Sequence, residues 1–132
     1  MNDINDLTHK VIGCAVKVHA FLRNGFQEVI YQMALAIELE KSKLLFKREV
    51  EMDIFYDETH IGTRRVDFFI ENEITVELKA VIKIEDVHLA QAKNYLEVFK
   101  IKTGLLINFG SKSLEFKRVY NNKNITNINN NN

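Results

Sequence analysis

The sequence lacks several features that would narrow its class: it has no proline, one cysteine (Cys14) and no net charge, with 18 basic and 18 acidic residues. A single cysteine excludes an intrachain disulfide, and we expect Cys14 to be a small buried side chain in a reducing, cytoplasmic setting. The zero net charge removes any argument from overall charge for nucleic-acid binding, although it leaves room for a local basic groove. We have no physical account of the missing proline.

Targeting and membrane segments are missing from the pattern as well. The first ten residues, MNDINDLTHK, contain acidic side chains and no apolar core, so we expect no signal peptide. No apolar run reaches the ~20 residues that a membrane-spanning helix needs, so we expect no membrane partner.

The signatures of several common site types are also missing. The four histidines, at positions 9, 19, 60 and 88, show no zinc-ligand spacing. There is no glycine-rich phosphate loop, no Ser-His-Asp order, and no helix-turn-helix or zinc-finger pattern. His19 precedes a motif described below and could approach a site there, but we expect a structural histidine with its hydrogen bonds satisfied.

What the chain has is the length and apolar content of one domain, which we assign to residues 1–120. The Asn-rich segment 121–132 is predicted to be a disordered tail. Apolar periodicity predicts helices at 5–22, 27–42 and 85–99, and strands at 47–56, 64–70, 74–80, 103–109 and 114–120. The order α-α-β-β-β-α-β-β predicts an α/β or α+β fold with helices packed on a sheet.

Residues 65–79, RVDFFIENEITVELK, form the most informative stretch. A hairpin centred near Asn72 would lay Asp67 opposite Glu77, where Cβ atoms are only ~5 Å apart and like charges repel. A divalent cation between the two carboxylates would remove that repulsion, and Lys79 falls on the same strand face as Glu77. The alternative is a surface hairpin with ordinary charge pairs, in which Lys79 compensates Glu77.

Strand alternation assigns these side chains to two faces. We expect Arg65, Asp67 and Phe69 on one face of their strand, and Val66, Phe68 and Ile70 on the other. Carboxylate oxygens suit Mg²⁺ or Mn²⁺, which would polarise a phosphate and lower the pKa of a bound water. Lys79 would then orient or deprotonate that water or neutralise developing charge, and Arg65 could contact phosphate, although a solvated arginine is the default.

Two helices carry further candidates. Gln91 and Tyr95 stand four residues apart and so face the same way, while Glu28 and Tyr31 stand three apart at the start of another helix. Glu28 is equally explained as a first-turn partner of the helix dipole, and Tyr95 as a core aromatic with a hydrated hydroxyl.

At this point a resemblance becomes evident. The segment GFQEVIY resembles the signature of the GxxExxY family, whose motifs are similar to those of the PD-(D/E)XK nuclease superfamily. VHAFLRNGFQEVIYQMAL, VDFF, TVELKAV, QAKNYL and LLINFG follow in the family's order over roughly residues 10–120. Two departures are Val66, where the superfamily has proline, and Leu22-Arg23-Asn24, where the family usually has Leu-Gly.

The resemblance implies a restriction-endonuclease-like core, a mixed sheet of about four or five strands flanked by helices. It implies that Asp67, Glu77 and Lys79 match the D…ExK site, and that Glu28 matches a helix acid that joins the metal ligands. It also implies that Gln91 and Tyr95 lie beside the site, and we add Tyr31 of the signature as a residue that binds or positions substrate.

Two functions follow as expectations. The first is a Mg²⁺- or Mn²⁺-dependent nuclease that hydrolyses phosphodiester bonds, with DNA favoured over RNA as partner. The second is a non-catalytic nucleic-acid-binding or protein-interaction module that keeps the nuclease fold, which the neutral charge favours. A chain of this size buries limited surface, so a homodimer or a larger assembly is compatible with either function.

Overall fold

A computed structural model describes residues 3–121 of the chain. Asn121, the first residue of the predicted tail, is buried and donates its backbone N–H to the carbonyl of Lys102, while the rest of that tail lies outside the described residues. The helices are α1 (Ile4–Leu22), α2 (Glu28–Lys41) and α3 (Asp86–Phe99). The strands are β1 (Phe46–Tyr56), β2 (Thr59–Ile70), β3 (Ile74–Lys79), β4 (Thr103–Asn108) and β5 (Glu115–Tyr120). No helix among these residues has both the length and the apolar character to cross a bilayer.

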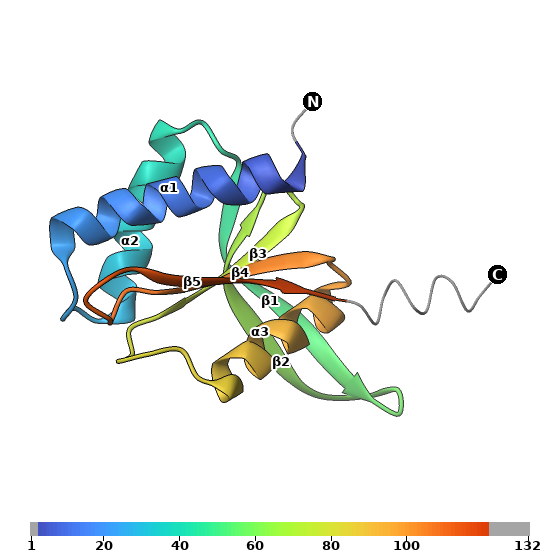
Figure 1. Cartoon of the computed structure of the whole chain (residues 1–132). Coiled ribbons are helices and arrows are strands. Elements are labelled where there is room, and N and C mark those ends of the chain that lie inside the picture. Colours follow the sequence, from blue (N-terminus) through green and yellow to red (C-terminus); the bar gives the residue numbers. More distant parts are fainter. Residues whose placement is uncertain (1–2, 122–132) are drawn as a thin grey trace.

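The strands form one five-stranded mixed sheet in the order β1-β2-β3-β4-β5. β3 and β4 are parallel and are connected through α3, whereas the other neighbours are antiparallel. Helices α1 and α2 cover one face of the sheet and α3 covers the other (Figure 1). The predicted order of elements and the α+β class are therefore confirmed.

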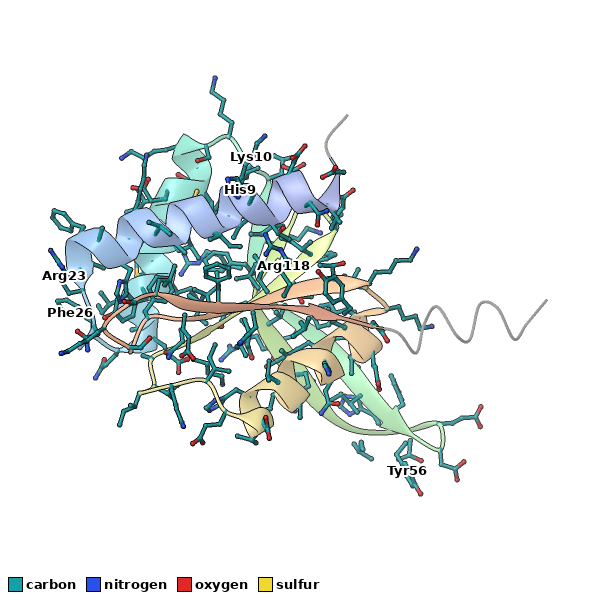
Figure 2. The ribbon with its side chains drawn as sticks, in the orientation of Figure 1. His9, Lys10, Arg23, Phe26, Tyr56 and Arg118 are labelled. Carbon is teal, nitrogen blue, oxygen red and sulfur yellow. The ribbon has the colours of Figure 1, made fainter. Side chains whose placement is uncertain are left out.

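The hairpin of β1 and β2 is longer than the sequence pattern indicated. The sequence pattern predicts that the second strand begins at Arg64, but β2 begins at Thr59 and only Asp57 and Glu58 make the turn. Both turn residues have positive φ (51° and 65°), the backbone that two-residue hairpin turns require. The hairpin projects beyond the rest of the sheet and carries Tyr56 near its tip (Figure 2).

The predicted alternation along β2 is wrong at one point. Phe68 and Ile70 pack in the core beneath α1 and α2, as expected, but Val66 packs on the opposite side with Tyr95 and Phe99 of α3. The change occurs at Asp67, between the pairs Arg48–Phe68 and Val50–Val66, and β1 has a left-handed residue at the same level, Glu49, with φ 52°. A local irregularity in the hairpin thus turns the strand, and Asp67 sits at the turning point.

Candidate active site

Asp67 and Glu77 come together where β2 and β3 part. The two strands pair over Phe68–Ile70 and Ile74–Val76. Beyond these pairs, Oδ2 of Asp67 accepts a hydrogen bond from the backbone N–H of Leu78 at 2.7 Å. This side-chain bond replaces a backbone bond between the two strands. The carboxyls of Asp67 and Glu77 are hydrogen-bonded to each other. The structure therefore brings together the two acids that the sequence put opposite each other.

Burial sets the charge of this acid pair. Glu77 is only 7% exposed, and desolvation is the main reason why its pKa rises from 4.5 to about 8. The negative charge of Asp67 and the hydrogen bond between the two carboxyls raise the pKa further, while the hydroxyl of Tyr95 and the charge of Lys79 oppose the rise. At neutral pH the acid pair therefore keeps one proton, and a cation could replace that proton between the two carboxyls.

A polar relay from α2 fixes Asp67, and the sequence argument missed it. Gln32 is buried, and its Nε2 donates to Oδ1 of Asp67 at 3.1 Å. Its Oε1 accepts from Nη2 of Arg48 at 2.9 Å. The available signal was the position of Gln32 four residues after Glu28, which puts both on one side of the helix.

Glu28 is less closely joined to the acid pair. It is the first residue of α2 and is exposed, one helical turn before Gln32 on the same side. Within residues 3–121, no three side chains of His, Cys, Asp or Glu are grouped closely enough to hold a metal ion. The structure thus brings together two of the three predicted metal ligands and leaves Glu28 at the adjacent helix end.

On the α3 side, Tyr95 contacts the acid pair directly. Its hydroxyl is hydrogen-bonded to Glu77, and burial together with the nearby Glu77 raises the pKa of Tyr95 to about 12. The guanidinium of Arg64 lies 4.7 Å from the centre of the Tyr95 ring. Gln91 is half-buried one turn earlier on the same helix side. Arg65, the arginine predicted from the sequence to lie beside Asp67, is exposed, whereas its neighbour Arg64 points toward Tyr95 of α3.

Tyr31 has a different environment from Tyr95. It is fully buried, its hydroxyl donates to the carbonyl of Arg23 at 2.6 Å, and it accepts the N–H of Phe26 at 3.1 Å. The ring stacks on Phe109 with centroids 4.7 Å apart. Tyr31 therefore closes the loop between α1 and α2 and holds the start of α2, where Glu28 lies.

The segment after Lys79 is clamped by the neighbouring strands. Lys79 is half-buried at the end of β3, in register with Asn108 of β4. The side chain of Asn108 bonds both the N–H and the carbonyl of Val81, and Glu115 accepts from Asn108 and from the N–H of Ile84. At Gly110 a Cβ atom would collide with the backbone of Val81, so this close approach requires glycine. Lys79 thus precedes a rigid loop.

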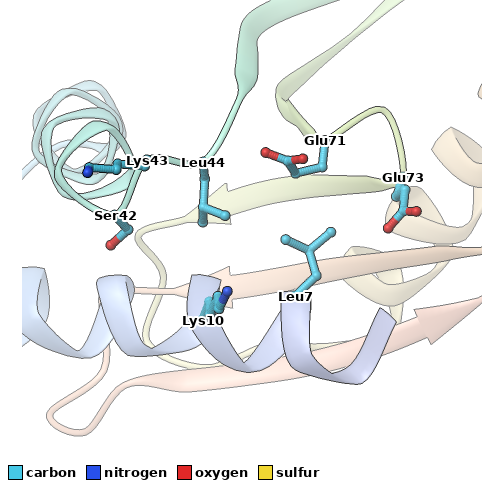
Figure 3. A pocket seen from close by; sticks show the side chains of 7 residues that line it. All are labelled: Leu7, Lys10, Ser42, Lys43, Leu44, Glu71 and Glu73. Carbon is cyan, nitrogen blue, oxygen red and sulfur yellow. The ribbon is translucent and has the colours of Figure 1, made fainter. Parts of the chain in front are cut away.

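A separate cavity of about 260 Å³ lies between α1, the end of α2 and the β2–β3 turn (Figure 3). Its charged lining comprises two lysines and two glutamates, Lys10, Lys43, Glu71 and Glu73. It shares no lining residue with the acid pair, and no predicted site residue faces it.

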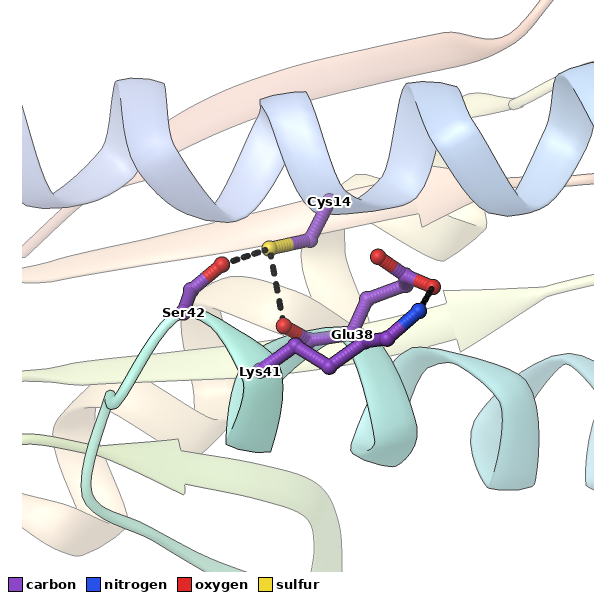
Figure 4. Close-up of polar contacts among 4 residues, drawn as sticks. All are labelled: Cys14, Glu38, Lys41 and Ser42. Atoms are coloured by element: carbon purple, nitrogen blue, oxygen red, sulfur yellow. Dashed lines mark hydrogen bonds and ion pairs between the residues drawn. The ribbon is translucent and has the colours of Figure 1, made fainter.

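Cys14 and His19, which the sequence predicts to be structural residues, both have structural roles. Cys14 is buried between α1 and α2, with its sulfur 3.3 Å from Oγ of Ser42 and 3.6 Å from the carbonyl of Glu38 (Figure 4). His19 is buried, and its Nε2 lies 3.0 Å from the carbonyl of Ser111. Both therefore support helix packing, as the sequence led us to expect.

The fold and the acid pair together define a nuclease-like class: a mixed sheet flanked by helices, with the D…ExK residues where two central strands part. The family model of the PD-(D/E)XK nuclease superfamily matches residues 5–119, and the chain belongs to this superfamily. The chain is also similar to the protein in the crystal structure of SSO0001, with 20% identity and a TM-score of 0.56. That likeness covers 69% of this chain and 48% of the other, so the chain spans about half of the longer protein. No curated protein matches the chain.

Proposed function

We propose that this domain is a Mg²⁺- or Mn²⁺-dependent nuclease that hydrolyses phosphodiester bonds, with DNA as the favoured substrate. The observation that carries the proposal is a buried glutamate pressed against an aspartate, with a pKa of about 8 for Glu77. Two adjacent buried carboxyls are unfavourable without a positive partner. Mg²⁺ and Mn²⁺ suit this position, because they bind one or two carboxylates and complete their coordination with waters and phosphate oxygens. Membership of a nuclease superfamily supports the same reading.

Asp67 and Glu77 would hold the ion, with Glu28 joining from the end of α2 directly or through water. When bound, the ion supplies charge for the scissile phosphate and a more acidic water. Gln32 and the N–H of Leu78 orient Asp67, and Tyr95 orients Glu77. Lys79 would orient the attacking water or neutralise charge that develops on the phosphate.

The remaining candidates would act around this centre. Gln91 and Arg65 would contact substrate, together with Arg64 beside Tyr95. Tyr31 would be a positioning residue, because its hydroxyl holds the loop from which α2 begins. Two expectations from the sequence remain predictions: that residues 1–120 form one domain, and that the protein is cytoplasmic.

The test is calorimetric titration of Mn²⁺ and Mg²⁺ into wild type and Asp67→Ala, followed by incubation with labelled single- and double-stranded DNA and RNA. Wild type should bind metal and cleave at least one of these substrates. Metal binding should also release protons, and repeating the titration in buffers of different ionisation enthalpy gives their number. Removal of a residue that only hydrogen-bonds to a metal ligand typically lowers metal affinity or activity by roughly 10–100-fold. Asp67→Ala removes a ligand itself, so its metal affinity and its cleavage activity should fall by more than this.

Asp53→Ala is the matched control, since this exposed carboxylate contacts His60 on the hairpin, apart from the acid pair. It should bind metal and cleave as wild type does. If wild type binds no metal at millimolar concentration and cuts none of the four substrates, the nuclease proposal fails.

The second candidate, a non-catalytic binding module, is favoured by one specific observation. Among residues 3–121 the acids do not form a three-ligand group, and Glu28 is exposed. This reading predicts nucleic-acid or protein binding that is indifferent to metal and to Asp67→Ala.

A further inference from the structure

Arg48 of β1 connects the surface of the molecule to the polar relay that ends at Asp67. Its side chain is exposed, yet its Nη2 donates to Oε1 of the buried Gln32 at 2.9 Å. Among residues 3–121, Arg48 forms no ion pair with a carboxylate. A hydrogen bond from a guanidinium to an amide oxygen is charge-assisted, which makes it stronger than one between neutral groups. The relay therefore begins at a cation on the surface.

The backbone of β1 turns this arginine toward α2. Residues two apart in a regular strand share a face of the sheet. Here Arg48 bonds to α2, whereas Val50 packs on the α3 side, against the cluster that contains Tyr95. The residue between them, Glu49, has φ 52°, a conformation that is unfavourable for residues other than glycine. The chain thus accepts an unfavourable conformation at Glu49 in the arrangement that lets Arg48 reach Gln32.

The two neighbours of Gln32 decide which way its amide group points. A rotation of 180° would exchange the amide oxygen and nitrogen with little intrinsic cost. Arginine has donors and no acceptor, so it can pair only with Oε1 of Gln32. Nε2 is then directed to Oδ1 of Asp67, 3.1 Å away, while Oδ2 accepts the N–H of Leu78. With the amide reversed, an oxygen of Gln32 would face an oxygen of Asp67, and Oδ1 would lose its donor.

We propose that Arg48 is a positioning residue of the candidate site: it fixes the orientation of the Gln32 amide, which in turn fixes the side chain of Asp67. The inference rests on the proposed metal-dependent function, in which Asp67 is a ligand. The N–H groups of Gln32 and Leu78 hold one oxygen each, and every carboxylate oxygen keeps a lone pair for a cation. Arg48 acts only through Gln32 in this role, as an outer partner that orients a ligand.

Removal of the guanidinium should release the amide. Arg48→Met keeps a long side chain but leaves Oε1 of Gln32 buried without its donor, which is unfavourable. The amide then rotates or turns away, and Asp67 loses the fixed donor on Oδ1. We expect Gln32→Met to lower the affinity for Mn²⁺ by roughly 10–100-fold, and Arg48→Met, one step further from the metal, by about 10-fold.

The first test observes the amide directly, in the protein without metal. The Nε2–H signals of Gln32, identified in proton–nitrogen NMR spectra by their absence from Gln32→Met, should exchange slowly with water, because the group is buried and hydrogen-bonded. In Arg48→Met their exchange should be about tenfold faster. Arg48→Lys, which keeps a cationic donor, should restore part of the protection. Unchanged exchange in Arg48→Met would overturn the proposal.

Lys47→Met is the matched control for this test. Lys47 is the exposed neighbour of Arg48 on β1, and the variant loses the same charge without touching the relay. The exchange of the Gln32 amide and the affinity for Mn²⁺ should both stay as in wild type. An effect of Lys47→Met as large as that of Arg48→Met would show that charge alone is responsible, which contradicts the proposal.

The second test is calorimetric titration of Mn²⁺ into Arg48→Met, Gln32→Met and the double variant. If Arg48 acts through Gln32, the double variant should bind Mn²⁺ no more weakly than Gln32→Met does. Additive losses would overturn the proposal. So would wild-type Mn²⁺ affinity in Arg48→Met with a raised KM for cleavage, because Arg48 would then contact the phosphate instead. If wild type binds no Mn²⁺ but the Gln32 amide responds to Arg48→Met, the nuclease proposal fails, while the positioning of Asp67 through Gln32 is supported.

Discussion

The two faces of the sheet bury different chemistry. Beneath α1 and α2 lies one large apolar cluster that runs from Leu7 to Phe109. Beneath α3 lie two small clusters, and the sheet also buries two polar side chains, Thr75 and Glu77. Stabilisation is therefore concentrated on the first face, and the second can accommodate a buried acid whose presence lowers stability at neutral pH. Three changes would test this division.

The largest effect is expected from truncating one phenylalanine on each face. Phe68→Ala removes a fully buried ring from the large cluster and should lower the free energy of unfolding by about 4 kcal/mol. Phe99→Ala, on the α3 side at 8% exposure, should cost about 2–3 kcal/mol. Urea unfolding followed by circular dichroism measures both. Equal losses would show that the two faces contribute alike.

The next effect is a dependence of stability on pH that comes from Glu77. Its pKa is about 8 in the folded protein against 4.5 for the free side chain, so the folded state binds more protons between these values. The stabilisation is complete below pH 4.5 and is lost as the pH rises through about 8, by up to about 1.4 kcal/mol per unit.

Glu77→Gln should remove this slope and make the protein more stable than wild type above pH 8, while abolishing metal binding. Unfolding curves in urea between pH 5 and pH 9 measure the difference. Addition of Mn²⁺ should flatten the slope of wild type and leave that of the variant unchanged. A variant that is less stable than wild type at pH 9 would contradict the assignment.

The smallest effects are expected from removing the hydroxyl groups of Tyr31 and Tyr95, which should affect different properties of the protein. Tyr31→Phe leaves the N–H of Phe26 and the carbonyl of Arg23 without their partner, and should cost about 1–2 kcal/mol. Tyr95→Phe should cost less in stability. It removes a hydrogen bond that lowers the pKa of Glu77, so the pH midpoint of Mn²⁺ binding should move upward. Calorimetric titration at several pH values distinguishes the variants, and the same midpoint in both would refute the distinction.

The fold was accessible from sequence because its signals are local. The helical periodicity and the apolar runs gave the correct element order, and the turn centred near Asn72 gave a hairpin that brings Asp67 to Glu77. These features depend on spacing within one element or across one turn, where periodicity is informative.

What the sequence could not give depends on tertiary geometry. Alternation predicted Arg65 beside Asp67, but the left-handed Glu49 on the neighbouring strand turns β2 and presents Arg64 instead. Gln32 was missed because its partner, Asp67, is 35 residues away and no local pattern joins them. Tyr31 belongs to the same signature as Glu28, and only its burial shows that its hydroxyl bonds to the backbone.

The clamp on the loop after Lys79 has a consequence for how long the site keeps its shape. Glu115 accepts two of its hydrogen bonds, and it lies on β5, an edge strand of the sheet. Edge strands detach from a sheet more often than central ones do. Each time β5 opens, Asn108 loses one partner and Ile84 is released, so amide exchange at Ile84 should keep pace with that of β5. The persistence of the geometry around the loop after Lys79 then depends on fraying at the margin of the sheet, far along the chain from Asp67 and Glu77.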